Sequence, residues 1–256
     1  MRNIEWIMDC AQELAPFFSK YEPRNHSMAE ILGGILWILV SGSQWCLLPR
    51  EIFPPKSTCY YWFNKFRKDN NLDEIMNYLN IPDLKTIEEA YVDATFTEAK
   101  QGGEKIGGTK AGKGSKVFAV ISKEKKILHL SIENASPHEA SFVPGIIKDI
   151  NKKTKILNLI GDKAYDSHPL KQAAKKMGVQ MISPDRKNRI HNKEDGRRLR
   201  RYKRRHRVEN FFADLQTYRR VVTRYEKIPE NHLSFLKLAV ICLNVTKYNV
   251  IQVKAA

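Results

Sequence analysis

The sequence has few cysteines and no long apolar run. Its four cysteines, Cys10, Cys46, Cys59 and Cys242, are scattered and form no Cys-x-x-Cys pair. This spacing argues against a zinc site or a disulfide framework and fits a reducing compartment. The longest apolar run, residues 31–40, is about half as long as a membrane helix needs to be, and no signal-peptide pattern is recognisable. We therefore expect an intracellular protein without a membrane partner.

Acidic residues are also scarce relative to basic ones. The 256 residues include 44 Lys and Arg but only 28 Asp and Glu, a net charge of +16. A hydrophobic fraction of 42% is enough to build a core, which excludes a disordered basic tail. The length fits one large domain or one domain plus a small helical one. The charge predicts a polyanionic partner.

The positive charge is concentrated in one segment. Residues 1–85 have a net charge of −1, whereas residues 186–207 contain 12 basic and two acidic residues. Such a block can be a targeting signal or a solvated helical face. We favour a phosphate-contacting patch, because a carboxylate motif follows it directly. The DNA-contacting residues predicted here are Arg197, Arg198, Arg200, Arg201, Lys203, Arg204 and Arg207.

The first 80 residues have helical patterns. Ser27 and Glu30 predict a capping box that begins a helix ending near Ser41. A second helix is expected from Ser57 to about Asn70, and its basic side predicts further DNA contacts. These are Lys65, Arg67 and Lys68. The helix pair resembles a helix-turn-helix DNA reader, although simple packing of its aromatic residues against a neighbouring helix is an equal alternative.

From residue 86 onward, short apolar runs predict strands that alternate with helices. The order is three strands, helix, strand, helix, strand and long helices. The expected strands are 90–96, 114–122, 125–133, 155–162 and 179–184, and the expected helices are 136–153, 168–178, 199–220 and 229–248. This order resembles the ribonuclease-H-like α/β fold, a mixed sheet flanked by helices. We therefore expect a small all-helical, DNA-binding domain at 1–85 and a catalytic domain at 86–256.

Three acidic residues interrupt otherwise apolar stretches: Asp93, Asp162 and Glu209. A charge in such a setting is costly unless it is paired or binds a metal. Mg²⁺ prefers one or two carboxylates together with substrate phosphate oxygens, and two such ions can activate the attacking oxygen and stabilise the leaving oxygen of a phosphodiester. Taken singly, each residue fits a salt-bridged surface carboxylate, but the trio beside the basic block predicts a metal site.

The helix that carries Glu209 predicts which side chains accompany it. At about 100° per residue, Tyr202, Arg205, Glu209 and Gln216 lie within about 60° on one face. We expect Arg205 to orient Glu209 or a phosphate and Tyr202 to sit beside the scissile strand. The alternative for Arg205 and Glu209 is an ordinary ion pair one helical turn apart.

These residues lie in motifs that resemble a DDE transposase of bacterial insertion sequences, of the insertion-sequence-five type. The motifs are YVDATF around Asp93, GDKAYDS around Asp162, and the spacing of Tyr202, Arg205 and Glu209. The family has Lys where this chain has Gln216, and Gln cannot neutralise a phosphate. The resemblance covers about residues 27–250 and includes SPHEA at 136–140 and the segment 41–68.

The resemblance implies DNA cleavage at the ends of a mobile element, followed by joining of the freed 3′ hydroxyl to target DNA. Asp93, Asp162 and Glu209 would hold two Mg²⁺ ions, with Mn²⁺ as a substitute, and Arg205 and Tyr202 would complete the catalytic set. The expected partners are double-stranded DNA and a second copy in a synaptic homodimer, in the cytoplasm at the nucleoid. Alternatives are a catalytically inactive or domesticated DNA-binding protein and a ribonuclease-H-like nuclease without strand transfer.

One further motif nearly matches a phosphate-binding loop. GGTKAGKG at residues 107–114 has the glycine and lysine spacing, but Gly114 replaces the hydroxyl residue and a strand follows instead of a helix. We therefore expect no nucleotide cofactor, and we expect a flexible, lysine-bearing loop between strands.

Overall fold

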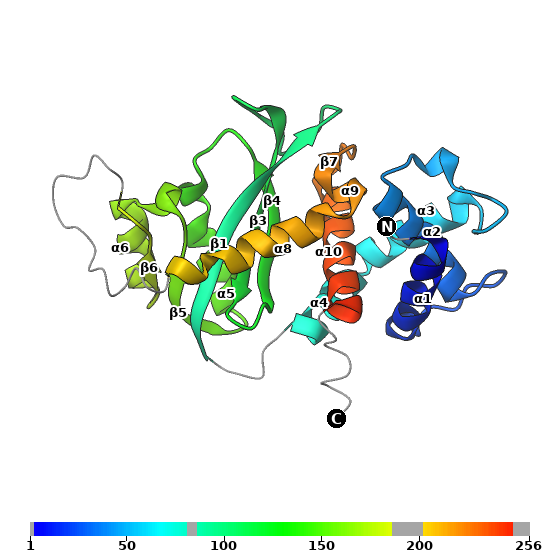
Figure 1. Cartoon of the computed structure of the whole chain (residues 1–256), viewed down its shortest axis with the longest axis horizontal. Coiled ribbons are helices and arrows are strands. Elements are labelled where there is room, and N and C mark those ends of the chain that lie inside the picture. The colour runs from blue at the N-terminus through cyan, green and yellow to red at the C-terminus, as the bar shows by residue number, and fades with distance from the viewer. Residues whose placement is uncertain (1–2, 81–85, 186–201, 248–256) are drawn as a thin grey trace. The chain divides into compact units, whose positions relative to one another are not determined.

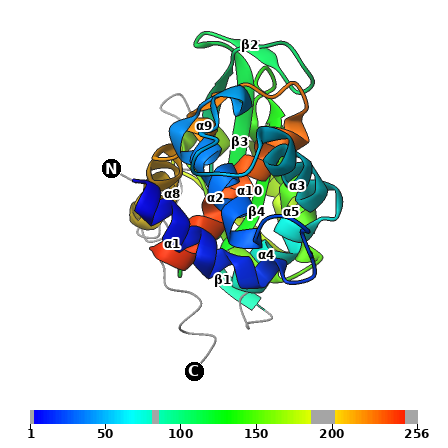
Figure 2. The ribbon, with the colours of Figure 1, turned by 90° about the vertical axis from the view of Figure 1, so that its right-hand side faces the viewer.

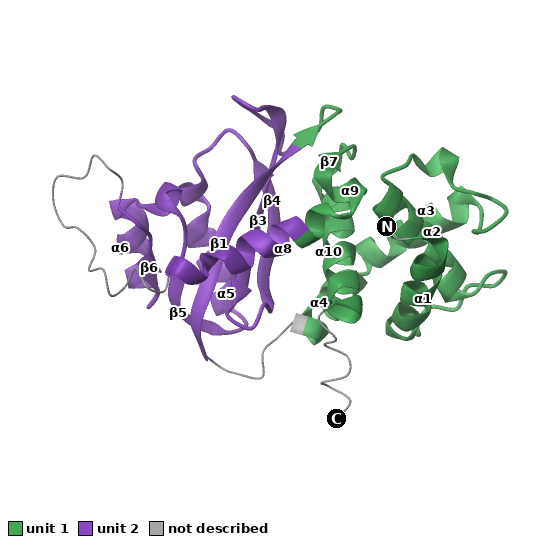
Figure 3. Cartoon of the chain, viewed as in Figure 1, with its two compact units in different colours: residues 1–79, 98–104, 214–256 green, residues 80–97, 105–213 purple. Residues whose placement is uncertain are grey.

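The computed structural model describes residues 3–80, 86–185 and 202–247. The chain forms two compact units (Figure 3). Unit 1 comprises 1–79, 98–104 and 214–256, and unit 2 comprises 80–97 and 105–213. The C-terminal segment therefore groups with the N-terminal helices, whereas the sequence places a domain boundary only at 85/86. The division into a DNA-binding and a catalytic domain stays a prediction.

Unit 1 is mainly helical. Its elements are α1 (Ile4–Leu14), η1 (Ala15–Phe18), α2 (Met28–Ser41), η2 (Trp45–Leu47), α3 (Lys56–Lys68), α4 (Asn71–Asn80), α9 (Arg219–Val222), β7 (Thr223–Arg224) and α10 (Pro229–Thr246). Helices α1, α2 and α3 lie together in Figure 2. Aromatic rings fill the core, with Phe63 stacked on Phe235 at 4.4 Å between ring centroids. None of the helices in the described segments is both long and apolar enough to cross a bilayer.

The start and end of α2 confirm the predicted helix. The Ser27 hydroxyl accepts from the Glu30 backbone N–H at 3.2 Å, and the Glu30 carboxylate accepts from the Ser27 N–H at 2.7 Å. Gly42 then ends the helix in the left-handed region, with φ of 71°, where glycine is favoured. Helix α3 is also confirmed, because it spans Lys56–Lys68.

Unit 2 is built on a mixed sheet. Its strands are β1 (Thr86–Ala99), β2 (Gly107–Thr109), β3 (Gly112–Ser122), β4 (Ile127–Asn134), β5 (Lys155–Ile160) and β6 (Gln180–Ile182). The sheet order is β2-β3-β1-β5-β6, and β4 also pairs with β3. Strands β1, β5 and β6 run parallel, whereas β2 and β4 are antiparallel to β3. This mixed sheet confirms the predicted ribonuclease-H-like class.

The two faces of β1 have different neighbours. Ala90 and Val92 belong to the apolar core beneath α5 (Val143–Asn151) and α6 (His168–Lys176). Because side chains alternate along a strand, Glu89, Tyr91 and Asp93 lie on the other face. That face carries η5 (Lys203–Arg205) and the start of α8 (His206–Gln216), which Figure 1 shows crossing the sheet.

Three expected elements differ in the structure. The segment 107–114 is a β-hairpin and not a flexible loop, since Gly107, Gly108 and Thr109 pair with β3. The helix expected at 136–153 begins only at Val143, because His138 caps a separate short turn, η3 (Glu139–Ser141). Helix α8 begins at His206, and the expected start of that helix at 199 lies outside the described residues.

Candidate active site

Asp93 lies on β1, and Asp162 takes the matching position just beyond the end of the parallel strand β5. The last registered pair of β1 and β5 is Tyr91 with Ile160, and each aspartate lies two residues further along the chain. Neighbouring strands are about 4.8 Å apart. The two carboxylates therefore lie close together, and the charge of Asp162 acts on Asp93.

The Asp93 carboxylate is largely buried and bound on both oxygens. The Arg205 guanidinium donates to Oδ2 at 2.9 Å, and the Ala94 backbone N–H donates to Oδ1 at 3.0 Å. Burial raises the pKa of Asp93 to about 6, and the charges of Asp162 and Glu139 act in the same direction, whereas Arg205 partly offsets them. The site therefore concentrates negative charge around Asp93.

Arg205 connects two of the predicted catalytic carboxylates. One guanidinium nitrogen binds Asp93, and the other donates to the Glu209 carboxylate one turn along the chain. The Tyr202 ring lies 5.6 Å from the guanidinium carbon. Although burial opposes it, the two carboxylates raise the pKa of Arg205. The predicted group of Tyr202, Arg205 and Glu209 is thus brought together at Asp93.

Asp162 begins the short turn η4 (Lys163–Tyr165) immediately after β5. Its Oδ1 accepts from the Ala164 N–H at 2.8 Å, which fixes the carboxylate at the strand end. Tyr165 is fully buried beside it. The pKa of Tyr165 is raised by burial and then by the charges of Glu139, Asp93 and Asp162. These four groups share one acidic edge.

Two acidic residues near this edge were not among the predicted site residues. Glu139 contributes to the field around Asp93, and the Lys116 amine lies 3.6 Å from its carboxylate. Glu89 is buried and accepts from the Tyr91 hydroxyl at 2.9 Å and from Arg204 at 3.0 Å. Because side chains alternate along a strand, Glu89 lies on the same face of β1 as Asp93. This alternation was the sequence signal that could have identified Glu89 as a site residue. Glu139 lies in SPHEA, a segment included in the family resemblance, which was the available signal for this residue.

The predicted DNA-contacting residues have varied surroundings. Lys203 and Arg204 are exposed, and Arg204 pairs with Glu89. Arg207 donates to the Lys123 carbonyl, and the Lys65 amine lies 3.3 Å from Asp69. Arg67 is half-buried and Lys68 is exposed on α3, while Arg197, Arg198, Arg200 and Arg201 lie outside the described residues. DNA contact by all of these residues stays a prediction.

The donor set at this edge fits a hard divalent cation, because Asp93, Asp162 and Glu209 offer only carboxylate oxygens. Arg205, however, stands between Asp93 and Glu209. Within the described part of the chain, no three acidic, histidine or cysteine side chains lie close enough to form a metal cluster. Metal binding by this trio therefore stays a prediction, and it requires Glu209 or Arg205 to move.

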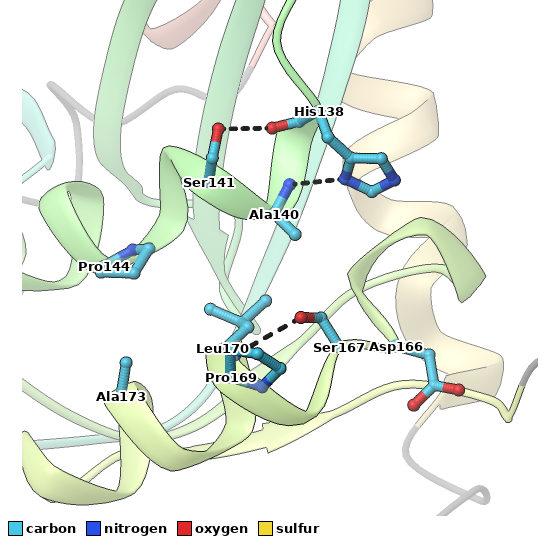
Figure 4. A pocket seen from close by; sticks show the side chains of 9 residues that line it. All are labelled: His138, Ala140, Ser141, Pro144, Asp166, Ser167, Pro169, Leu170 and Ala173. Carbon is cyan, nitrogen blue, oxygen red and sulfur yellow. Dashed lines mark hydrogen bonds between the residues drawn. The ribbon is translucent and has the colours of Figure 1, made fainter.

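A hollow of about 620 Å³ opens beside the acidic edge (Figure 4). The His138 ring accepts from the Ala140 N–H at 3.2 Å on one lip, and the Ser167 hydroxyl begins α6 on the other. Asp166 is held by Lys171 at 3.2 Å. The hollow is lined by His138, Ala140, Ser141, Pro144, Asp166, Ser167, Pro169, Leu170 and Ala173. The hollow therefore lies beside two of the acidic residues' chain neighbours: its lining includes both residues that flank Glu139, and Asp166, which follows Asp162 by four residues.

Fold and site together define a ribonuclease-H-like α/β protein with one carboxylate on its central strand β1 and a second directly after the neighbouring strand β5. The family profile "Transposase DDE domain" matches residues 86–245. A second profile, "Putative transposase of IS4/5 family", matches residues 10–76. The chain therefore belongs to the DDE transposase family, of the IS4/5 type, which confirms the resemblance read from the sequence.

The chain is similar to several solved structures at low sequence identity. The chain is similar over its full length to 77% of a piggyBac transposase in a synaptic complex with hairpin DNA, with 8% identity and a TM-score of 0.53. A second match is a chain in the simian T-cell lymphotropic virus intasome: it covers 54% of this chain and 41% of that chain, with 11% identity and a TM-score of 0.35. A third is the catalytic core domain of BIV integrase: it covers 59% of this chain and 82% of that chain, with 13% identity and a TM-score of 0.29. This chain thus spans less than half of the intasome chain. No curated protein matches.

Proposed function

We propose that this protein is an active transposase that cuts DNA at the ends of its own insertion sequence and joins the freed 3′ hydroxyl to target DNA. The observation that carries the proposal is the acidic edge of unit 2. Asp93 lies within β1, Asp162 follows the neighbouring strand β5, and Arg205 connects Glu209 to Asp93. Family membership supports the same chemistry.

In this mechanism Asp93, Asp162 and Glu209 would hold Mg²⁺, with Mn²⁺ as a substitute. Bound there, the cations would supply charge stabilisation and activate the attacking and leaving oxygens of the phosphodiester. Arg205 keeps Glu209 beside Asp93 and would turn toward a phosphate when the carboxylates take up the metal. Tyr202, stacked near Arg205, would lie along the scissile strand.

The proposed substrates are double-stranded element ends and target DNA. One structure that is similar over the full length of this chain is a transposase complex with hairpin DNA. The net charge of +16 favours a polyanion here as well. Bringing two ends together calls for a homodimer. Because the substrate is chromosomal DNA, we propose a cytoplasmic, nucleoid-associated location.

A plasmid carrying the gene with its flanking DNA tests this proposal. Purified protein with Mg²⁺ should release the element and insert it into a second plasmid, and EDTA should abolish both products. Binding to the ends without any cleavage would contradict catalysis and favour an inactive or domesticated DNA-binding protein, which is the reading that Gln216 supports. Cleaved ends without inserted products would favour a nuclease.

A further inference from the structure

We propose that the β2–β3 hairpin, residues 107–114, is a second DNA-contacting surface that binds the phosphate backbone away from the carboxylates. Its strands are joined by a two-residue turn, Lys110 and Ala111, because Thr109 pairs with Gly112. The inference rests on the proposed function, since it takes DNA as the substrate of the acidic edge. It assigns a role to GGTKAGKG, the glycine- and lysine-rich motif that does not fit a nucleotide-binding loop.

The hairpin has one face against the protein and one face in solvent. Gly107 and Gly114 are cross-strand partners and are buried. A Cβ on Gly107 would lie 2.0 Å from the Asn134 side-chain oxygen, and a Cβ on Gly114 would lie 2.2 Å from a backbone carbonyl of β1. The next pair, Gly108 and Lys113, is exposed. Because successive pairs face opposite sides, the Lys113 side chain points away from the protein.

Hydrogen bonds hold the hairpin in place. The Thr109 hydroxyl accepts from the Ala111 N–H and donates to the Gly112 carbonyl, both at 3.1 Å, which fixes the turn. Side chains of Ser115, Asn134 and Ser136 donate to the carbonyls of Lys105, Ile106 and Gly108, respectively. The lysines at the tip are therefore carried on an ordered support, which lowers the entropic cost of binding.

The charge of the hairpin has one sign. Residues 105–116 contain four lysines and no acidic residue. Lys105 and Lys116 form ion pairs with Glu133 and Glu139 at its base. Lys110 and Lys113 are exposed at its tip. Two exposed lysines near the tip of a narrow ribbon suit the phosphates that border a nucleic-acid groove, and such a groove admits a two-stranded ribbon.

Gly108 gives a second observation in favour of a DNA backbone that approaches the hairpin closely. A Cβ built on it meets no atom within 4 Å in the described part of the chain, and its φ lies outside the left-handed region. The fold therefore does not require glycine at this position. Beside Lys113, glycine leaves the backbone bare, so that a phosphate chain can approach closely.

The proposed contact lies at a defined distance from the catalytic carboxylates. Gly114 adjoins Thr97, four residues along β1 from Asp93, and Gly112, which borders the two-residue turn, lies two residues from Gly114. At about 3.3 Å per strand residue, the tip lies roughly 20 Å from Asp93. At about 3.4 Å per base step, this corresponds to roughly six base pairs from the scissile phosphate.

The test compares Lys110→Ala/Lys113→Ala with a control, Lys175→Ala/Lys176→Ala, which removes two exposed lysines at the end of α6. The dissociation constant for a random-sequence duplex is measured over a range of salt concentrations. Each lost phosphate contact lowers the slope of log K against log salt by about 0.9. We expect a reduction of about 1.8 for the hairpin variant and no change for the control. Equal slopes for both variants would overturn the inference.

Gly108→Ala gives a second readout that does not remove charge. Because a Cβ has room there, the variant should melt like the wild type but bind the duplex several-fold more weakly. Unchanged affinity would contradict close backbone approach. DNA cleavage is measured in a separate assay. If the wild-type protein binds DNA but does not cut it, the proposed function is contradicted. The salt dependence of binding still decides whether the hairpin contacts DNA.

Discussion

Arg205 links two of the three predicted catalytic carboxylates, Asp93 and Glu209. It binds Asp93 through one nitrogen and Glu209 through the other, at a position where both carboxylates would otherwise repel. The planar guanidinium presents its donors in a fixed fork, so it can hold two carboxylates in a defined geometry. The arrangement makes Arg205 a positioning residue for Glu209, and it explains why the Arg-x3-Glu spacing accompanies the aspartates.

Replacing Arg205 with Gln should therefore slow DNA cleavage by roughly 100-fold, because Glu209 is no longer held at the site. Arg205→Lys retains the charge but not the bridge, and we expect an intermediate rate. The rates are measured in single turnover with saturating Mg²⁺, and circular dichroism verifies the fold. Cleavage at the wild-type rate by the Gln variant would contradict the positioning role.

His129 in β4 makes stability depend on pH. Burial lowers the pKa of His129 to about 4, whereas an unfolded histidine titrates near 6.5. Below pH 6.5 the unfolded chain binds a proton that the folded chain refuses until about pH 4. The free energy of unfolding should therefore fall by about 3 kcal/mol as the pH drops through this window.

The variant His129→Phe keeps the ring but cannot be protonated. We expect its loss of stability between pH 6.5 and pH 4 to be smaller than that of the wild type by the same amount, in urea unfolding at several pH values. Identical pH profiles for the two proteins would show that His129 does not titrate as its burial indicates.

At the scale of elements, the β2–β3 hairpin contains two adjacent glycines with different surroundings: a side chain has no room at Gly107 but has room at Gly108. Gly107→Ala places a methyl group against Asn134 and Ser136 and should cost about 1–3 kcal/mol, as overpacking does. Gly108→Ala meets open space and should change stability little. Thermal unfolding of the two variants measures the difference. Equal melting temperatures would contradict the close packing of the hairpin on its support.

Elements with a strong local signal could be predicted from the sequence. Ser27 and Glu30 specify the start of α2, and apolar runs specify β3, β4 and β5. The hairpin was missed because its glycine-rich strand β2 has no alternating pattern. The start of α5 was placed too early, since Pro137 marks a turn capped by His138 instead of a helix.

The candidate site could be predicted in part, because some of its residues also have a strong local signal in the sequence. Asp93, Asp162 and Glu209 stand out because each interrupts an apolar run, and helical spacing brings Arg205 to Glu209. The contribution of Glu139 depends on where the turn after β4 packs against the turn after β5. Such a contact between distant segments leaves no periodic signal in either of them.

At the scale of the whole molecule, the charge is unevenly placed. The segment 186–207 holds a net charge of +10, while residues 1–85 are close to neutral. Arg204 and Arg205, at the end of the basic segment, bind acidic residues of β1. The basic segment thus leads directly to the acidic edge, which supports a phosphate-guiding role beside the site. Base-specific recognition by the N-terminal helices stays a prediction.

The most direct test of the central claim is the cleavage and joining activity of Asp162→Asn with Mg²⁺. Asn keeps the size of the side chain and still accepts from the Ala164 N–H, so the fold should be retained. The control is Asp149→Asn, which changes an exposed aspartate on α5 paired with Lys152. We predict that Asp162→Asn loses both activities by more than about 100-fold, since even changes behind a metal ligand cost 10- to 100-fold, and that the control keeps them. Wild-type activity in Asp162→Asn would contradict the assignment of this acidic edge as the catalytic centre.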